Sequence, residues 1–404
     1  MTSKVFRSIG VGIAATAVLA AAGACGSSKK NDNGGGNGGN SNSSKSVTIA
    51  YMGAQTGADA QLGINGSNGV QLALEEHNAK KGVTQVKYTV YDTQGDPTQA
   101  SSQARKAIQD VKAKSLVGIV GPAFSGESKT SLPILDQAKI PNITPTATNV
   151  DLAKQGYKYW HRALANDAVQ GPGDADFMAK TLKAKDVAVI DDQSDYGKGL
   201  GDAVRAQLKT DGVTVNPSDK IDPKASDYSS TVNEIKAANP DTVFFAGYYS
   251  AAAKLIKQLR DAGVKATFMA GDGSQDGKLA DEAGPSANGA ILSCTCSLAV
   301  GSSDPTVAAF DKNYQAKWGS APSTYSSEAL DATNIFLQAI DAGKTTPDAI
   351  NDYLKTVDYK GVSKQISFAP TGELKGSLLF ISEIIKGKLT YLGEAATVQP
   401  KPGS

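Results

Sequence analysis

Small polar and aromatic residues gather where strand-like segments of this chain give way to helix-like ones. Hydroxyls and free backbone amides at a helix start suit a carboxylate, a buried acid suits an ammonium, and tyrosine offers an apolar face with a polar tip. The residues concerned are Ser125, Thr146, Thr148, Tyr196, Tyr248 and Asp272. Together they predict a site that recognises a free amino acid. Taken singly, Ser125 and Asp272 could be helix caps, and the tyrosines could belong to the core.

The elements that position these turns alternate between short apolar, β-rich runs and helical stretches, a pattern that predicts βαβ units and parallel sheets. The expected strands span 47–53, 86–92, 116–121, 140–144, 187–190, 213–215, 242–245 and 267–270, and the expected helices span 69–78, 97–111, 200–208, 232–238 and 251–262. Asp96 is expected to cap the helix that Pro97 opens. Ligands of such sheets lie past the carboxyl ends of the strands. Chemistry is therefore expected at 53–63, 121–128, 144–149, 191–197, 247–250 and 271–276.

Enzyme signatures are scarce at these turns. The chain has no GxxxxGK[ST] loop and no GxSxG elbow around Ser125, and Gly197-Lys-Gly-Leu-Gly201 lacks the GxGxxG spacing. Of the two histidines, His77 falls in an amphipathic helix and is expected to be partly exposed. His161 lies in the aromatic stretch 157–162 and is expected to pack or to hydrogen-bond. Because a His-based triad or a zinc site needs more partners, we predict no catalysis, no metal and no cofactor.

The N-terminus has the layout of a secretory signal. Lys4 and Arg7 precede an uncharged run from Ser8 to Ala24, which ends at Cys25. The segment before Cys25 resembles the lipobox of bacterial lipoproteins, which implies cleavage of residues 1–24 and lipidation of Cys25. The protein would then be exported and lipid-anchored to the outer face of the cytoplasmic membrane. The alternative is an uncleaved membrane helix, but a span needs about 20 apolar residues and this stretch is short and rich in Ala and Gly.

The remaining chain reads as a tethered two-lobed body. Residues 26–46 hold no sizeable apolar side chain, so residues 25–46 form a lipidated cysteine and a flexible Gly/Asn/Ser tether. Removing 24 residues from 404 leaves 380, which exceeds a single core of about 250–300 residues and predicts two lobes. With 41 basic and 40 acidic residues the net charge is +1, so nucleic acid is not expected as a partner.

A family resemblance emerges from an ordered set of segments. They include Gly118-Ile-Val-Gly-Pro-Ala-Phe-Ser125, Ile143-Thr-Pro-Thr-Ala-Thr148, Asp195-Tyr-Gly-Lys-Gly199, Phe245-Ala-Gly-Tyr248 and Phe268-Met-Ala-Gly-Asp-Gly273, together with 47–57, 69–73, 91–97, 167–172 and 373–376. From Val47 to about Leu392 the chain resembles the leucine/isoleucine/valine-binding branch of type 1 periplasmic solute-binding proteins.

The resemblance implies an α/β fold of two Rossmann-like lobes with parallel-sheet cores, joined by a three-segment hinge, with the ligand held between them. Lobe I would comprise 47–166 and 295–372, and lobe II 167–294 and 373–396, followed by a tail at 397–404. The hinge would lie near 165–167, 294–297 and 369–376.

The resemblance also implies a role for each site residue. Ser125 and Thr148 would offer hydroxyls to the ligand, and Thr146 its backbone carbonyl. Tyr196, Tyr248 and Asp272 would reach across from the second lobe, with Asp272 opposite the ammonium. Ala123 and Phe124 would line the side-chain pocket, and Gly273 would complete the set. Two positions depart from the family: Leu62 stands where an aromatic often covers the ligand, and Asp272 is one methylene shorter than the usual glutamate.

Cys294 and Cys296 form a Cys-x-Cys pair in an exported chain. An oxidising compartment allows a disulfide, although residues two apart in a straight strand lie near the ~7 Å limit, so a bond needs a local bend. Free thiols remain an alternative, and a metal site would need two more soft ligands.

The resemblance indicates an extracytoplasmic substrate-binding lipoprotein of an ABC importer. It would capture a branched-chain or similar aliphatic amino acid and deliver it to permease subunits in the membrane. The alternative is a sensory or regulatory module on the same fold that binds an amide or a small polar solute. An enzyme ranks third, because the turns lack an activated nucleophile or base.

Overall fold

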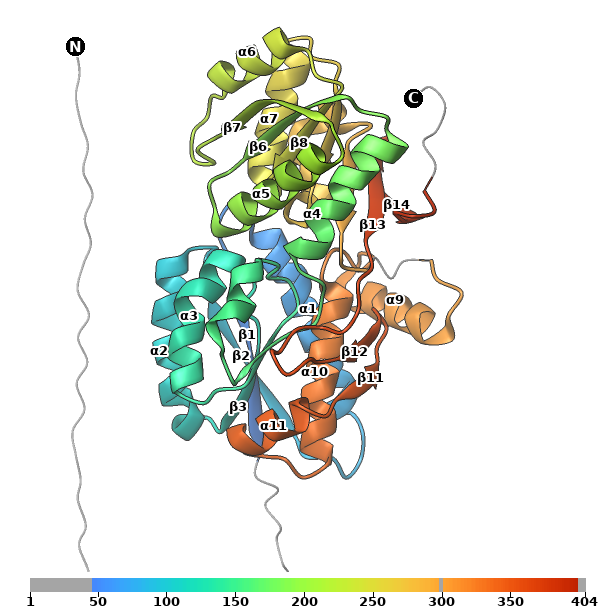
Figure 1. Cartoon of the computed structure of the whole chain (residues 1–404). Coiled ribbons are helices and arrows are strands. Elements are labelled where there is room, and N and C mark those ends of the chain that lie inside the picture. Colours follow the sequence, from blue (N-terminus) through green and yellow to red (C-terminus); the bar gives the residue numbers. More distant parts are fainter. Residues whose placement is uncertain (1–45, 298–300, 399–404) are drawn as a thin grey trace, which may run out of the picture. The chain divides into compact units, whose positions relative to one another are not determined.

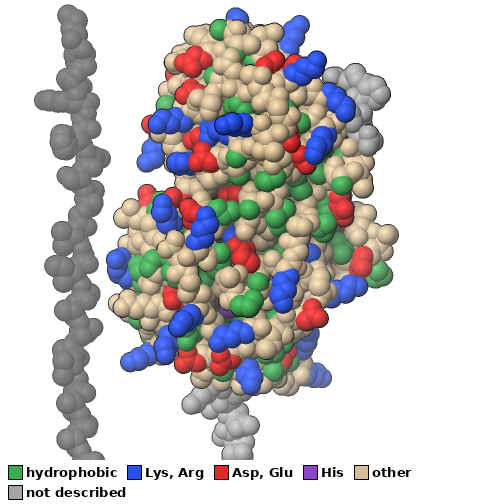
Figure 2. Space-filling model, in the orientation of Figure 1, with side chains coloured by type: hydrophobic (Ala, Val, Ile, Leu, Met, Phe, Trp, Pro, Cys, Tyr) green, Lys and Arg blue, Asp and Glu red, His purple; other side chains and the backbone are tan. Residues whose placement is uncertain are grey.

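The computed structural model describes residues 46–297 and 301–398. The expected signal peptide, Cys25 and all but the last residue of the tether therefore lie outside the described residues, as does the tail beyond residue 398. Within the described ranges, no helix is both long enough and apolar enough to cross a membrane. Basic and acidic side chains are interspersed over the face shown in Figure 2, in keeping with the near-zero net charge.

The first sheet has the strand order β2-β1-β3-β4-β5, and every neighbouring pair is parallel. Its strands are β1 (Val47–Gly53), β2 (Val86–Asp92), β3 (Leu116–Val120), β4 (Asn142–Thr144) and β5 (Trp160–Arg162). The helices α1 (Ala60–Asn78), α2 (Pro97–Ala113), α3 (Ser125–Gln137), α10 (Ser326–Asp341) and α11 (Pro347–Leu354) surround it. α1 packs against α10 and α2 against α3, and the two pairs flank the sheet in Figure 1. We call this part lobe I.

The second sheet has the order β14-β13-β10-β9-β8-β6-β7. Its strands are β6 (Asp186–Asp191), β7 (Thr214–Lys220), β8 (Thr242–Ala246), β9 (Thr267–Ala270), β10 (Ile291–Cys294), β13 (Phe380–Ile385) and β14 (Lys388–Glu394). Pairing is parallel from β10 to β7, whereas β13 and β14 add an antiparallel edge. Its helices are α4 (Asp167–Asp176), α5 (Asp195–Thr210), α6 (Ser229–Ala238), α7 (Tyr249–Asp261) and α8 (Gly277–Ala283). We call this part lobe II.

Short elements complete the fold. They are the antiparallel pair β11 (Asp358–Lys360) and β12 (Gln365–Ser367) and the segments η1 (Val150–Gln155), η2 (Phe177–Thr181), η3 (Asp272–Ser274) and η4 (Gly284–Ala287). The longer helix α9 (Pro305–Trp318) precedes α10. The expected α/β fold with parallel-sheet cores in two lobes is confirmed. The antiparallel edge of lobe II was not expected.

Most expected elements match the structure within a few residues, and the Asp96 cap is confirmed, because its carboxylate accepts the backbone N–H groups of Thr98 and Gln99. α1, however, begins at Ala60, nine residues before the expected start at Gly69. Its first half holds Gly63, Gly66 and Gly69, which lower helix propensity. A Cβ at Gly63 would lie 1.8 Å from the carbonyl oxygen of Ala54, so close packing explains why this helix uses glycine.

The expectation that His77 would be partly exposed is wrong. His77 is buried, and its Nε2 lies 2.9 Å from Oδ1 of Asp341 in α10. The residue therefore belongs to the α1–α10 contact, where Asp341 engages its Nε2.

The chain passes between the two sheets three times: after β5, after β10 and after β12. At the first and third passages, the fully buried guanidinium of Arg162 forms a bidentate ion pair with Glu373. The same guanidinium donates to the carbonyl oxygens of Ala147 (3.0 Å) and Asn149 (2.9 Å). The backbone N–H of Arg162 donates to the carbonyl of Gly372 at 2.9 Å. One side chain thus joins two hinge segments to the loop that follows β4.

Buried carboxyls lie beside this hinge. Burial raises the pKa of Asp167, the first residue of α4, to about 7; the charge of Asp272 adds to the rise, while Thr148 and Arg162 oppose it. Burial also raises the pKa of Asp174 well above its usual range, with the charges of Asp272 and Asp167 as further causes. A buried ionised carboxylate is costly, so these groups make the folded state favour protonated acids.

We predict that Asp167→Asn stabilises the protein at pH 8 and has little effect near pH 4. The unfolded carboxyl ionises near pH 4, whereas the folded one keeps its proton to about pH 7. Between these values the folded state binds more protons, so the free energy of unfolding of the parent falls as pH rises. The variant has no ionisable carboxyl at this position, so its free energy of unfolding does not fall in this way; the difference amounts to at most ~4 kcal/mol.

Urea unfolding of parent and variant from pH 4 to pH 8 tests this prediction. Asp176→Asn, at a partly exposed position in the same helix, is the control and should show no comparable pH-dependent gain. A stability difference that is the same at every pH would show that the Asp167→Asn substitution acts through packing and not through ionisation.

Candidate ligand-binding site

Turns from both lobes enclose one small space. It is lined by Ala123, Phe124, Ser125, Thr146, Tyr196, Tyr248, Asp272, Gly273 and Tyr325. Every residue expected to bind ligand is present except Thr148, and Tyr325 is an addition. Thr148 is buried two residues beyond Thr146, between the two carbonyl groups that Arg162 holds.

The lobe I wall follows β3 and β4. Ser125 is the first residue of α3, and its Oγ accepts the backbone N–H of Asn149 at 3.2 Å, which ties the two turns together. The hydroxyl of Thr146 donates to the carbonyl of Ala123. The buried Glu127 accepts the backbone N–H of Phe124 at 3.0 Å, and its burial raises its pKa to about 7. These hydrogen bonds, all made between lobe I residues, hold the lobe I wall in place.

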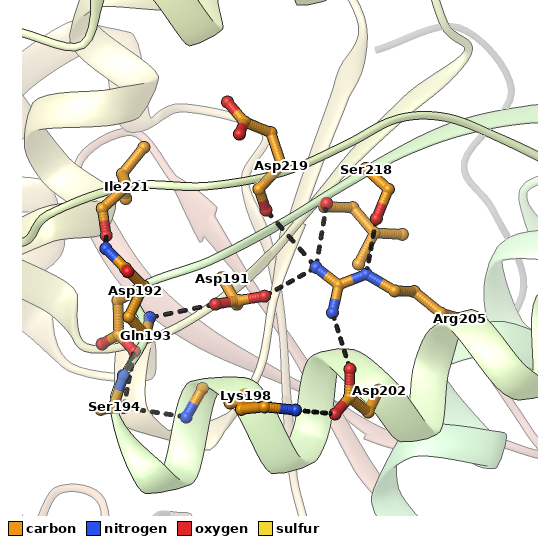
Figure 3. A network of polar contacts seen from close by, with 12 residues as sticks. Asp191, Asp192, Gln193, Ser194, Lys198, Asp202, Arg205, Ser218, Asp219 and Ile221 are labelled. Carbon is orange, nitrogen blue, oxygen red and sulfur yellow. Dashed lines mark hydrogen bonds and ion pairs between the residues drawn. The ribbon is translucent and has the colours of Figure 1, made fainter.

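The lobe II wall rests on the turn between β6 and α5. Figure 3 shows the guanidinium of Arg205 bonded to Asp191 (2.7 Å), Asp202 (3.1 Å) and Ser218 (2.8 Å). Ser194 in turn caps α5 by accepting the backbone N–H of Gly197 at 2.9 Å. This network sets the first turn of α5.

Asp192 connects this turn to the next one. Its Oδ1 accepts the backbone N–H of Ser194 at 2.9 Å, and its Oδ2 accepts that of Tyr248 at 3.3 Å. One carboxylate therefore joins the turn before α5, at Ser194, to the turn before α7, at Tyr248, and burial raises the pKa of this carboxyl to about 6.

Asp272 is the central charged group of the site. Its carboxylate is buried and accepts two tyrosine hydroxyls, from Tyr196 to Oδ1 at 2.6 Å and from Tyr325 to Oδ2 at 2.5 Å. Burial raises its pKa, while the two tyrosine hydrogen bonds oppose the rise. Among the described residues no lysine or arginine forms an ion pair with Asp272. A buried acid in this setting is best stabilised by a cationic group from outside the chain.

Aromatic rings from both lobes meet at the centre. The rings of Phe124 and Tyr248 lie 4.6 Å apart, and those of Tyr196 and Tyr248 lie 5.2 Å apart. The enclosed space measures about 10 Å³, near the ~10–15 Å³ that one water needs. An amino acid can therefore enter only when the lobes part or the rings move.

Further contacts join the lobes around the site. Nζ of Lys129 lies 2.5 Å from Oδ1 of Asp195, and the side-chain amide of Asn149 donates to the carbonyl of Asp195 at 2.6 Å. Elsewhere the amide of Asn65 donates to Asp276 at 2.8 Å. The described conformation is thus closed.

Sequence reasoning missed Tyr325. It precedes α10 and has a backbone φ of 72°, in the left-handed region that non-glycine residues rarely occupy. Such strained positions cluster at functional sites. The sequence around Tyr325 carries no signal for this conformation.

Two further groups of residues expected from the sequence lie elsewhere. Cys294 and Cys296 are joined by a disulfide with a Cα–Cα distance of 5.0 Å, at the end of β10. In the turn 53–63, Asp59 accepts the backbone N–H of Ser250 at 3.1 Å. Among the described residues, none from this turn lines the central space. Across the described ranges, no group of three or more His, Cys, Asp or Glu side chains is arranged to hold a metal.

Comparisons with known proteins agree with this architecture. The family model described as periplasmic binding protein matches residues 46–388. The Leu/Ile/Val/Thr-binding protein of Salmonella typhimurium is 31% identical over 336 residues, covering 82% of this chain and 89% of its own length. The Leu/Ile/Val-binding protein of Escherichia coli K12 is 30% identical over 338 residues, with the same coverage.

Solved structures show the same fold. The leucine-binding protein LivK of Thermotoga maritima superposes with a TM-score of 0.80 at 27% identity, covering 88% of this chain and 99% of its own. The branched-chain amino acid transporter substrate-binding protein LivJ of Streptococcus pneumoniae, in complex with isoleucine, gives a TM-score of 0.79 at 26% identity, covering 86% and 100%. This chain therefore belongs to the periplasmic binding protein family, in the leucine/isoleucine/valine-binding branch of its type 1 members.

Proposed function

We propose that this protein is the extracytoplasmic substrate-binding subunit of an ABC importer and that it captures a branched-chain or similar aliphatic amino acid. The observation that carries the proposal is the buried carboxylate of Asp272, which has two hydroxyl donors and no basic side chain among its described partners. A ligand ammonium would supply the missing positive charge. The names of the relatives, which include leucine and isoleucine binding, support this ligand class.

The other walls suit the rest of such a ligand. Ser125 at the start of α3 offers a hydroxyl and helix N-terminal amides to a carboxylate. Ala123, Phe124 and the ring of Tyr248 offer apolar surface to an aliphatic side chain. In this proposal Thr146 contributes its backbone carbonyl, since its hydroxyl is bonded to Ala123.

The proposal extends to lobe boundaries and location. Lobe I comprises 47–166 and 295–372, and lobe II comprises 167–294 and 373–396, so that they close around the ligand at the three passages. The signal at 1–24 is removed, Cys25 is lipidated, and residues 26–46 tether the body near permease subunits in the membrane.

We expect the amine site to dominate affinity. Asp272→Asn leaves a buried ligand ammonium unpaired and should weaken binding of the amino acid by roughly 2–5 kcal/mol. Ser125→Ala removes one hydroxyl while backbone amides remain, and should cost ~1 kcal/mol. Calorimetry with leucine, isoleucine and valine measures the order of the two effects.

Asp261→Asn is the matched control, because this exposed carboxylate at the end of α7 in lobe II lies outside the central site and pairs with Lys257. It should leave affinity unchanged. An unaltered affinity in Asp272→Asn would mean that the ligand carries no ammonium and would overturn the proposal.

We expect ligand to compact the protein. The closed state buries Asp272 without a cation, so the ligand-free protein should favour an open state and the ligand should shift it toward closure. Small-angle scattering should show a smaller radius of gyration with a saturating amino acid. Asp272→Asn at the same ligand concentration should not compact, and an unchanged radius in the parent at saturation would contradict closure.

We expect Cys25→Ser to release the protein from the membrane. The substitution removes the acylated thiol, while the folded body begins only at Val47. Fractionation of cells expressing parent and variant measures the change, and a matched affinity for the amino acid shows that the body is intact. Retention of the variant in the membrane fraction would favour an uncleaved helix.

A further inference from the structure

A second and larger cavity lies in lobe I, beside the third passage of the hinge. It measures about 580 Å³, within the roughly 300–1,000 Å³ typical of small-molecule pockets. It is lined by Ala153, Gly156, Tyr157, Lys158, Trp160, His161, Lys355, Phe368, Ala369, Pro370, Thr371, Gly372 and Lys375. The aromatic stretch 157–162, which the central site does not use, therefore forms one of its walls.

The aromatic side chains make this wall apolar. The ring of His161 lies 4.8 Å from that of Phe368, and both residues are buried. Burial lowers the pKa of His161 to about 4, aided by the charge of Lys355 and opposed by a backbone contact with Asn142, so the imidazole is neutral at neutral pH. Trp160 is 1% exposed, and its Nε1–H has no hydrogen-bond acceptor among the described residues.

The cavity has a basic rim. Three of its lining residues are lysines, and none of the described residues that line it is an aspartate or glutamate. Lys355 is paired with Asp352 at 2.7 Å. Within the described ranges, Lys158 and Lys375 form no ion pair.

Nearby acids are already engaged. Asp136 accepts the backbone N–H groups of Lys158 (2.6 Å) and Tyr159 (2.9 Å), and Glu373 is bound by Arg162. Lys158 and Lys375 therefore present positive charge to the cavity without an ion pair to a described carboxylate, whereas the charge of Lys355 is offset by Asp352.

Backbone hydrogen bonds hold the hinge-side wall in place. Gly372 donates to the carbonyl of Ala369 at 2.9 Å, and Ala369 donates to that of Glu373 at 2.7 Å. The carbonyl of Gly372 accepts the N–H of Arg162, and Lys375 donates its backbone N–H to Ser367 at 2.9 Å. The wall is thus formed before any ligand arrives, which lowers the ordering cost of binding.

We propose that this cavity is a second binding site, specific for a small monocarboxylate with an aromatic or branched apolar body. The carboxylate pairs with the lysine rim, and the body packs on Tyr157, Phe368 and the neutral ring of His161. A free amino acid is disfavoured here, because its ammonium would face the lysines and meet no acid. The site is therefore complementary to a different ligand class from that of the central site.

Nuclear magnetic resonance of the folded protein tests the site directly. The chain holds two tryptophans, Trp160 and Trp318, so the indole N–H region has two signals. Trp318 ends α9, packs near Tyr314 and Lys317, and does not line the cavity as described, so it serves as an internal control. Trp318→Phe assigns the signals. Phenylacetate should shift the Trp160 signal saturably and leave that of Trp318 in place.

Matched probes and variants test the chemistry. Phenylacetamide, which has the same shape but no charge, should bind more weakly than phenylacetate. The double variant Lys158→Gln/Lys375→Gln should weaken phenylacetate binding about threefold to tenfold, since each partly exposed ion pair contributes little. Lys209→Gln/Lys236→Gln changes the net charge equally at exposed positions of lobe II and should have no effect.

Asp272→Asn separates this proposal from the one for the central site, since it should leave phenylacetate binding intact whatever it does to amino-acid binding. Three results would each overturn the second site. They are an unmoved Trp160 signal at saturating phenylacetate, equal binding of phenylacetamide, and unaltered binding in the double-lysine variant.

Discussion

The buried guanidinium of Arg162 is the constraint on which the arrangement of the site depends. It binds Glu373 at one passage of the hinge and the carbonyl groups on either side of Thr148 in the loop after β4. Its charge is fully removed from water, so its partners must satisfy it, and loss of one would cost roughly 3–5 kcal/mol. Because of this requirement, the loop carrying Thr146 cannot move independently of the segment that carries the chain into β13. The hinge and the lobe I wall behave as one unit.

The lobe II wall obeys a different constraint, which is a buried acid without a basic partner among the described residues. Tyr196 and Tyr325 donate to Asp272 but bring no positive charge. Under the proposed function, the closed state without ligand is therefore penalised by desolvation of this carboxylate, and the ligand ammonium removes the penalty. Differential affinity of this kind is what a two-state closure requires, since a ligand can shift an equilibrium only by the difference in its affinity for the two states. The aromatic contact between Phe124 and Tyr248 adds attraction across the lobes that does not depend on ligand charge.

Local sequence pattern predicted the parts of the structure in which neighbouring residues decide the outcome. The buried parallel strands read as apolar runs, and the turns after them carry Ser125, Thr146, Tyr196 and Asp272 to one place. The sequence pattern gave wrong predictions where contacts between residues far apart in the chain determine the structure. His77 is buried because Asp341, 264 residues later, pairs with it. α1 extends through three glycines because the backbone of Ala54, the ring of Tyr51 and the backbone of Ser326 pack closely against them, and the intrinsic helix propensity of this segment does not suggest this.

Tyr325 is the site residue that the sequence did not predict, because the prediction considered only the turns that follow strands. It follows no strand of either sheet and enters the site from the start of α10, with its backbone in an unfavourable conformation. The hydrogen bond to Asp272 helps to explain why this conformation is kept, since it satisfies a buried hydroxyl and a buried carboxylate at once. The two cavities differ in the sign of the charge that lines them. Among the described residues that line the central space there is an acid, Asp272, and no lysine or arginine. Among those that line the cavity beside the hinge there are three lysines and no aspartate or glutamate. Each arrangement leaves one sign of charge to be completed from outside, so two ligand classes can be told apart by electrostatics before any fit of shape is considered.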